Sequence, residues 1–306
     1  MHIFNSIPIF FKKNESVDFH SLEMYLEKCV EDNIEFAYLM TYNSRVMQLD
    51  DSELVEITKF ISNTIKQTNI KLIISHPFLA TNKSLENYFK HFEDISSDIF
   101  AVSMLYPERY YGDDQFILDF LKIPADYGLK TLIHEQKLIS GYNGELINWP
   151  HSLIKKAIQD ESCIGIKEDS KDDNVTVEII DSFGNEKFIV VAGGGKRRTI
   201  ELHKKVKQRM CWLNGSSIIS PKLGSKFLQS LEQGDSFHES YIADFEIPFF
   251  DIVAKYGWHL THKAMLNYFL GTSPYERSPL PVLPQSILMQ EHSNLAKIKN
   301  FLERNQ

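Results

Sequence analysis

The sequence has few cysteines and no long apolar run. Its three cysteines, Cys29, Cys163 and Cys211, are widely spaced and include no CxxC pair, which argues against a disulfide framework and a structural zinc site. Apolar stretches such as residues 7–11 are far shorter than the roughly 20 residues that cross a bilayer. Two lysines follow that stretch directly, unlike the pattern of a secretion signal. We therefore expect a cytoplasmic protein without a membrane partner.

Positively charged residues are outnumbered by negatively charged ones. The 306-residue chain carries a formal net charge of -8 and has no long basic run, so nucleic acid is not an expected partner. By contrast, 43% of the residues are hydrophobic and 12% are aromatic. A chain of this length and composition can bury a large core as one domain, which excludes disordered and fibrous classes.

Short apolar, β-prone runs alternate with longer segments of helical period, which is the pattern of repeated βα units. The segments between the runs are amphipathic and long enough for crossover helices. Eight such runs predict an α/β fold in which eight parallel strands close into a (β/α)8, or TIM, barrel. The predicted strands are residues 7–11, 36–41, 71–76, 99–105, 130–135, 163–168, 187–192 and 209–214.

No further strand candidate follows Pro221, and helical patterns take over. These patterns cover residues 222–231, 235–256, 259–269 and 285–304. Since the first can be the eighth barrel helix, we expect residues 1–233 to form the barrel and residues 234–306 to form a C-terminal helical region. His259 and His262 lie in this region without a third ligand at suitable spacing, so we predict no metal site.

Lys167 lies at the carboxyl end of a predicted strand, where parallel barrels carry their catalytic groups. Its β-branched strand reads Cys163-Ile-Gly-Ile-Lys-Glu168, which brings the amine close to the apolar interior. Burial disfavours the charged ammonium, and a neutral amine can attack a carbonyl to form an imine, which is an electron sink. The alternative is a lysine that pairs with Glu168 or Asp169 at a strand end, which position alone favours.

The run Gly165-Ile-Lys-Glu-Asp-Ser170 resembles the lysine strand of the dihydrodipicolinate synthase and N-acetylneuraminate lyase family. Other segments agree with this resemblance in the same order along the chain. Residues 7–11 and 16–18 resemble the family's first strand and helix start, and residues 277–281 resemble its C-terminal crossing segment. The resemblance therefore covers essentially the whole chain, although only the lysine strand is specific by itself.

The family resemblance implies a (β/α)8 barrel with C-terminal helices and a Schiff base on Lys167. It also implies a small carbonyl or carboxylate substrate and a homo-oligomer, often a homotetramer built from two dimers. Gly193, Asn214 and Ser216 fall in segments where the family has glycines lining its site, so we take them as substrate-binding candidates. We predict no cofactor.

The turn after the second strand departs from the family pattern. The family usually carries a Gly-Thr-Thr-Gly-Glu turn that holds the substrate carboxylate, whereas this chain has Tyr42, Asn43, Ser44 and Arg45 after Thr41. Asn43 and Ser44 still offer hydrogen-bond donors. Arg45 either binds a carboxylate with both arms of its guanidinium group or lies at the solvated rim. All four residues are candidates for substrate binding.

The proton shuttle departs as well, because the family places a tyrosine at the end of strand five. This chain has Leu132-Ile-His-Glu135 there. If Ile133 holds the tyrosine's place, strand alternation makes Glu135 the candidate general base on the same face. His134 is then a structural histidine between the barrel and the helices. Tyr106 matches a tyrosine that the family uses in relaying protons.

The run Gly193-Gly-Gly-Lys-Arg-Arg-Thr199 follows the seventh predicted strand and opens a helix. Barrels often bind phosphate at this position with backbone amides and a helix N-terminus, which suggests a phosphorylated or multiply anionic substrate. Alternatively, the glycines only let the backbone approach the substrate, and the basic residues lie on the solvated helix face. We favour the second interpretation.

The sequence thus predicts a lyase or aldolase in which Lys167 forms an imine with a 2-oxo acid or related carbonyl compound. The enzyme then makes or breaks a carbon–carbon bond, or eliminates water, beside that imine. The altered turn and the lost tyrosine argue against the lysine-biosynthetic synthase reaction. One alternative is a catalytically altered barrel that binds a small anionic metabolite without imine chemistry. Another is a barrel that uses its glycine loop for phosphorylated sugars, with Lys167 still as nucleophile.

Overall fold

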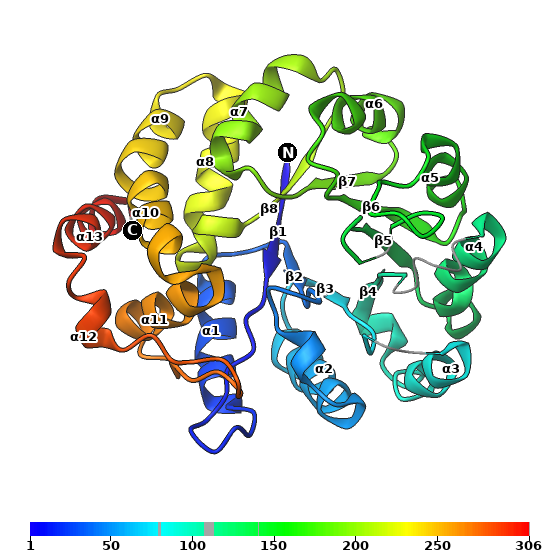
Figure 1. Ribbon diagram of the computed structural model, residues 1–306, viewed down its shortest axis with the longest axis horizontal. Coiled ribbons are helices and arrows are strands. Elements are labelled where there is room, and N and C mark those ends of the chain that lie inside the picture. The colour runs from blue at the N-terminus through cyan, green and yellow to red at the C-terminus, as the bar shows by residue number, and fades with distance from the viewer. Residues whose placement is uncertain (79–80, 107–112, 140, 306) are drawn as a thin grey trace.

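The computed structural model describes residues 1–78, 81–106, 113–139 and 141–305. Eight parallel strands pair in chain order, and the eighth pairs with the first, so the barrel is closed. Figure 1 shows the strands at the centre with helices around them, which confirms the predicted (β/α)8 fold. The strands are β1 (His2–Ser6), β2 (Phe36–Tyr38), β3 (Lys71–Ile74), β4 (Ile99–Met104), β5 (Thr131–Glu135), β6 (Cys163–Glu168), β7 (Phe188–Val191) and β8 (Cys211–Leu213).

The first strand was predicted at the wrong place. Residues 7–11 are not a strand but a buried extended segment that follows β1 and runs towards the C-terminal region. There Phe11 forms an isolated bridge to Tyr275, and the carbonyl of Ile9 accepts a hydrogen bond from Lys263. The apolar run is thus explained by the helices that cover it. The true strand carries Phe4, whose ring stacks on Phe36 inside the barrel with centroids 4.2 Å apart.

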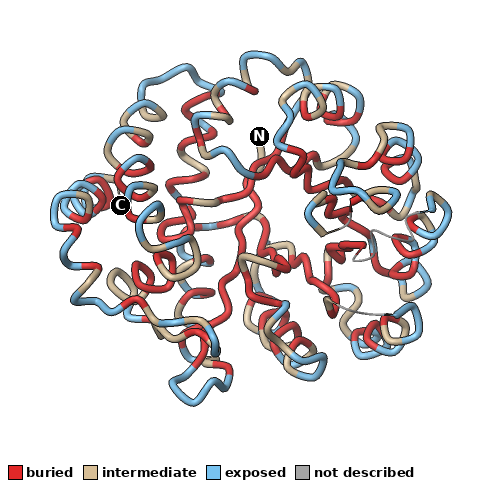
Figure 2. The backbone as a smooth tube through the Cα atoms, viewed as in Figure 1, coloured by how far each residue is buried: buried red, intermediate tan, exposed pale blue. Residues whose placement is uncertain are grey.

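Helices follow the strands, and several of them begin at a side chain that caps them. Asp18 accepts from the amide of Ser21 at the start of α1, and Asp50 forms a capping box with Glu53 at the start of α2. Each helix buries one face against the barrel and leaves the other exposed, as Figure 2 shows. The helices that follow strands are α1 (Phe19–Glu31), α2 (Asp51–Ile65), α3 (Asn82–Lys90), α4 (Asp114–Lys122), α5 (His151–Ile158), α6 (Asp173–Phe183), α7 (Gly195–Lys205) and α8 (Pro221–Gln233).

The C-terminal region is helical, as predicted, but more divided. The long helix predicted for residues 235–256 is interrupted by a π-helical turn, Ile242–Glu246. Pro248 follows that turn and cannot donate a backbone hydrogen bond to the carbonyl four residues earlier, which explains the wider turn. The helices here are α9 (Phe237–Tyr241), α10 (Ile247–Tyr256), α11 (Trp258–Leu270), α12 (Gln285–Leu288) and α13 (His292–Asn305). In the described part of the chain, no helix has the length and apolarity needed to span a membrane.

Aromatic side chains fill the amino-terminal end of the barrel. Phe4, Phe36, Phe100 and Phe188 pack together there with ring centroids 4.2 to 5.9 Å apart. This layer closes one end, as packed side chains do in barrels of this kind. The site must therefore be sought at the opposite end, where the strands end.

Candidate active site

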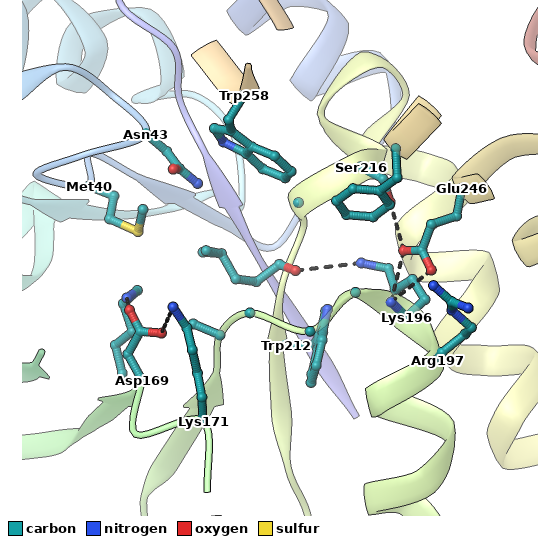
Figure 3. A pocket seen from close by; sticks show the side chains of 18 residues that line it. Met40, Asn43, Asp169, Lys171, Lys196, Arg197, Trp212, Ser216, Glu246 and Trp258 are labelled. Carbon is teal, nitrogen blue, oxygen red and sulfur yellow. Dashed lines mark hydrogen bonds and ion pairs between the residues drawn. The ribbon is translucent and has the colours of Figure 1, made fainter. Parts of the chain in front are cut away.

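A cavity of about 410 Å³ opens at the carboxyl ends of the strands. Figure 3 shows Asp169 and Lys171 at one end of it and Lys196, Ser216 and Glu246 at the other end. Trp212 and Trp258 lie between these two groups. The cavity therefore has an apolar middle and two charged ends.

Lys167 lines this cavity and is 2% exposed. Its Nζ lies 2.8 Å from Nε2 of His134 and 3.1 Å from Oδ2 of Asp169. The register of β5 and β6 pairs His134 directly with Lys167. The amine is thus held inside the barrel between an imidazole and a carboxylate.

His134 and Glu135 each lie on the face of β5 opposite to the one predicted. Leu132 packs in the barrel interior and Ile133 in the layer between strands and helices, so alternation turns His134 inward and Glu135 outward. The prediction was wrong because it gave Ile133 the inward position of the family tyrosine. His134 is the residue at the end of strand five that meets the lysine.

Burial holds the pKa of His134 well below its usual range, and the positive charge of Lys167 lowers it further. The imidazole is therefore neutral near pH 7. An ammonium only donates hydrogen bonds, so Nε2 accepts from it and the ring proton lies on Nδ1. Nδ1 is buried and has no hydrogen-bond partner among the described residues. In this state Nε2 carries no proton and can accept a hydrogen bond from the amine.

Glu135 lies outside the cavity, on the helix-facing side of β5. It pairs in register with Glu168, whose carboxylate accepts from the amide of Ser170 at 2.7 Å and from the hydroxyl of Thr176 at 2.6 Å. Burial, and then the charge of Glu168, raise the pKa of Glu135 to about 7. We predicted Glu135 as a general base beside Lys167. That prediction is wrong, because the carboxyl group lies on the other side of the strand.

Tyr106 lies at the end of β4, in the layer that faces the helices. Its ring packs edge-on against Phe120 of α4, with centroids 5.3 Å apart. It is not among the described residues that line the cavity. Its role as a proton relay stays a prediction that this placement does not favour.

Only Asn43 of the four turn residues after β2 lines the cavity. Tyr42 is partly buried against the barrel interior, where burial and then the charge of Asp169 raise its pKa. The Ser44 hydroxyl accepts from the amide of Met40 at 2.9 Å, within the turn itself.

Arg45 follows neither of the two predictions made for it. It has a left-handed backbone, φ 62°, and its buried guanidinium lies 3.5 Å from the carboxylate of Glu276 in the C-terminal region. It therefore neither lines the cavity nor lies at a solvated rim. The ion pair fixes the turn to the C-terminal region instead.

Gly193 and Ser216 line the cavity, whereas Asn214 has a structural role. The amide oxygen of Asn214 accepts from the backbone N–H of Ser6, and so links β8 to β1. The Ser216 hydroxyl lies 3.0 Å from that of Tyr241 and donates to Glu246. Two of the three candidates taken from these segments thus meet at the site.

The N-terminus of α7 is already occupied by a carboxylate. Both oxygens of Glu246 accept from the backbone N–H of Lys196, at 2.8 and 3.0 Å. The predicted phosphate position is therefore filled by a side chain from the π-helical turn. The Lys196 side chain is buried rather than solvated, and it donates to the carbonyl of Asn214 at 3.1 Å.

Lys171 and Glu246 were not predicted as site residues, and Asp169 was predicted only as an ion-pair partner of Lys167. Alternation along β6 could have placed Asp169 on the same side as Lys167, two residues away. Glu246 carried no signal, because it reaches the cavity from a helical turn fifty residues beyond its partner Lys196. Within the described residues, no group of three His, Cys, Asp or Glu side chains could hold a metal ion.

The fold and cavity define a (β/α)8 barrel with a buried lysine at its mouth and helices added at its C-terminus. Solved structures of N-acetylneuraminate lyases and dihydrodipicolinate synthases share this fold. Proteus mirabilis N-acetylneuraminate lyase matches with a TM-score of 0.79 and 15% identity over 98% of this chain and 97% of that chain. Oceanobacillus iheyensis dihydrodipicolinate synthase matches with a TM-score of 0.78 and 13% identity over 98% and 96%.

A further match is a catalytic lysine mutant of Ruminococcus gnavus sialic acid aldolase, with a TM-score of 0.79 and 12% identity over 99% of this chain and 97% of that chain. No protein-family model matches the sequence, and no curated protein is significantly similar to it. The likeness is therefore one of fold along the full length of the chain, including the C-terminal helices.

Proposed function

We propose that this protein is a Schiff-base lyase or aldolase of the N-acetylneuraminate lyase and dihydrodipicolinate synthase family that acts on a 2-oxo acid. The observation that carries the proposal is the contact of Lys167 with the neutral imidazole of His134 inside a cavity. A nucleophile with an adjacent base is the arrangement that covalent catalysis needs. The shared fold, and the catalytic lysine of one of the similar aldolases, support it.

Imine formation begins when Lys167 gives a proton to Nε2 of His134. The free amine attacks the C2 carbonyl carbon, which forms the new carbon–nitrogen bond. His134 then transfers two protons from the Lys167 nitrogen to the former carbonyl oxygen, which leaves as water. The protonated imine keeps the single positive charge of the starting ammonium, and the carboxylate of Asp169 lies beside that charge.

Cleavage follows from the electron demand of the imine. In a 4-hydroxy-2-oxo acid the bond between C3 and C4 breaks, and its electron pair moves through C3 and C2 to the nitrogen. The C4 hydroxyl gives its proton to His134 as C4 becomes an aldehyde. Protonation of the enamine at C3 and hydrolysis by water then release the shortened 2-oxo acid and free Lys167. The reverse sequence makes the bond.

The lysine-biosynthetic synthase reaction is not the activity that we propose. The resemblance assigns carboxylate binding in the family to the turn after strand two, and here the Ser44 hydroxyl and the Arg45 guanidinium are engaged elsewhere. A filled α7 N-terminus likewise argues against a phosphorylated substrate. The homotetramer and the cytoplasmic setting stay predictions.

A pyruvate-release assay tests the proposal. The purified protein is incubated with a panel of 4-hydroxy-2-oxo acids and sugar acids, and pyruvate is measured through lactate dehydrogenase. We expect at least one compound to be cleaved by the wild type and not by Lys167→Ala, with Lys204→Gln on the exposed face of α7 as control. Equal rates in the wild type and Lys167→Ala would contradict the proposal.

A second candidate function is binding of a small anion without imine chemistry. The ion pair between Lys167 and Asp169 favours it, because a charged amine binds carboxylates but does not attack carbonyls. A thermal-shift screen with 2-oxo acids and sugar acids separates the two functions. Stabilisation without any reducible adduct would favour binding alone.

A further inference from the structure

Lys171 lies in the loop between β6 and α6, four residues after Lys167. Its backbone is left-handed, φ 60°, which is uncommon for a residue with a side chain. The side chain extends over Gly193, where an added Cβ would lie 2.9 Å from Cε of Lys171. Gly193 is itself left-handed, φ 77°. The left-handed backbone of Lys171 and the missing side chain of Gly193 thus allow this lysine to lie along the cavity wall.

Asp169 joins the two lysines. Its Oδ2 lies 3.1 Å from Nζ of Lys167, and its Oδ1 lies 3.8 Å from Nζ of Lys171. One carboxylate therefore spans the distance between the two amines. In the imine of a 2-oxo acid, the substrate carboxylate is bonded to the carbon that Lys167 holds. It is therefore placed next to the Lys167 nitrogen, where the amine of Lys171 can reach it.

The remaining charged groups of the cavity do not compete for this role. The Lys196 ammonium is held by backbone carbonyls, and Arg197 lies with it at the far end near Glu246 (Figure 3). The turn after β2 offers Asn43, a neutral side chain. Of the described residues that line the Lys167 end of the cavity, Lys171 carries the cation that remains accessible. Its side chain is 58% exposed.

We propose that Lys171 binds the carboxylate of the substrate whose carbonyl Lys167 attacks, and so selects 2-oxo acids over neutral ketones and aldehydes. This inference rests on the proposed imine chemistry. In it, Lys171 replaces the hydroxyl and amide donors that the resemblance assigns to the family's turn after strand two. The substrate carboxylate takes the place of Asp169 as the partner of Lys171, and Asp169 stays paired with the imine nitrogen.

The test compares pyruvate with methyl pyruvate, which keeps the ketone but lacks the charge. Each protein is incubated with either compound and cyanoborohydride, and the reduced adduct is measured by intact mass at a series of concentrations. We expect Lys171→Gln to raise the half-saturating pyruvate concentration, because the variant loses the ion pair with the substrate carboxylate. The increase should be only about tenfold, because an exposed ion pair stabilises less than a buried one. Trapping by methyl pyruvate should be unchanged.

Three further variants make the result specific. Lys171→Arg should retain most of the preference for pyruvate, and Lys204→Gln should behave as the wild type. Gly193→Ala, whose Cβ displaces Lys171, should shift the pyruvate curve in the same direction as Lys171→Gln. Equal pyruvate curves for the wild type and Lys171→Gln would overturn the inference and leave the imine proposal standing. Equal losses with both probes would also overturn it, and a wild type that neither compound labels would overturn both proposals.

Discussion

Lys167 and Lys196 are two buried lysines in the wall of one cavity, 2% and 1% exposed. Lys167 meets an imidazole nitrogen and a carboxylate. Lys196 donates to backbone carbonyls and lies 5.8 Å from the centre of the Trp212 ring. Burial lowers the pKa of Lys196 to about 8, yet its hydrogen-bond partners are backbone carbonyls, which do not take up protons. Burial is common to both residues, so the adjacent imidazole is what makes Lys167 the proposed nucleophile, whereas Lys196 is an anchored cation.

The comparison also divides the cavity by function. The Lys167 end carries His134, the proposed base, whereas the Lys196 end is fixed by Glu246, which links the π-helical turn to α7. Burial raises the pKa of Glu246 from its usual value, although the charge of Lys196 opposes this. We therefore expect changes at the first end to alter chemistry and changes at the second to alter stability.

His134→Gln should have the largest effect. Glutamine can still hydrogen-bond to Lys167 but cannot take its proton, so turnover should fall by a factor on the order of 10² to 10⁴. Steady-state kinetics and the rate of cyanoborohydride trapping measure this, with His91→Gln on the exposed surface as control. Wild-type rates in this variant would contradict the proposed difference between Lys167 and Lys196.

Lys196→Met should reduce stability while leaving trapping on Lys167 intact. The change leaves Glu246 buried without its positive neighbour, and we expect the free energy of unfolding to fall by about 3 kcal/mol. Urea denaturation measures the loss, and exposed Lys204→Met serves as the matched control. Loss of trapping at unchanged stability would show that the two lysines share the chemistry.

Glu135→Gln should have the smallest effect on chemistry, since this carboxyl faces the helices. Because the pKa of Glu135 is raised from 4.5 to about 7, the folded chain keeps a proton that the unfolded chain has released. Its contribution to stability is therefore present below pH 4.5 and lost as the pH rises through 7. The variant should therefore lose roughly 2 kcal/mol of the pH dependence of its unfolding free energy. Thermal melts at pH 5 and pH 8 measure this change. Turnover should stay near that of the wild type. A collapse of turnover would restore Glu135 as a base.

The sequence was sufficient for the barrel because each βα unit carries its own pattern. β6 is found at the residues predicted for it, and the other later strands lie within one to three residues of the predicted bounds. The face of a strand was harder to predict. The register of β5 and β6 shifts between Thr131 and Leu132, where Ile164 is an extra residue before Gly165. That bulge lies in β6, so the wrong faces in β5 come instead from giving Ile133 the place of the family tyrosine, because a one-residue error inverts the whole set.

The second half of the site depends on contacts between distant residues. Arg45 pairs with Glu276, and Glu246 meets Lys196 from a turn whose geometry follows from Pro248. No local pattern in the sequence indicates either partner. The position of Lys167 in the cavity wall was predictable because a single strand carries the signal, whereas the groups around it come from several elements.

Peptide mapping after trapping identifies the lysine that forms the imine. The wild-type protein is incubated with pyruvate and cyanoborohydride, digested, and sequenced by tandem mass spectrometry. We expect a reduced pyruvyl adduct on Lys167, with Lys196 and Lys171 unmodified. An adduct on Lys196, or a protein unlabelled by pyruvate and by every other 2-oxo acid offered, would contradict this expectation.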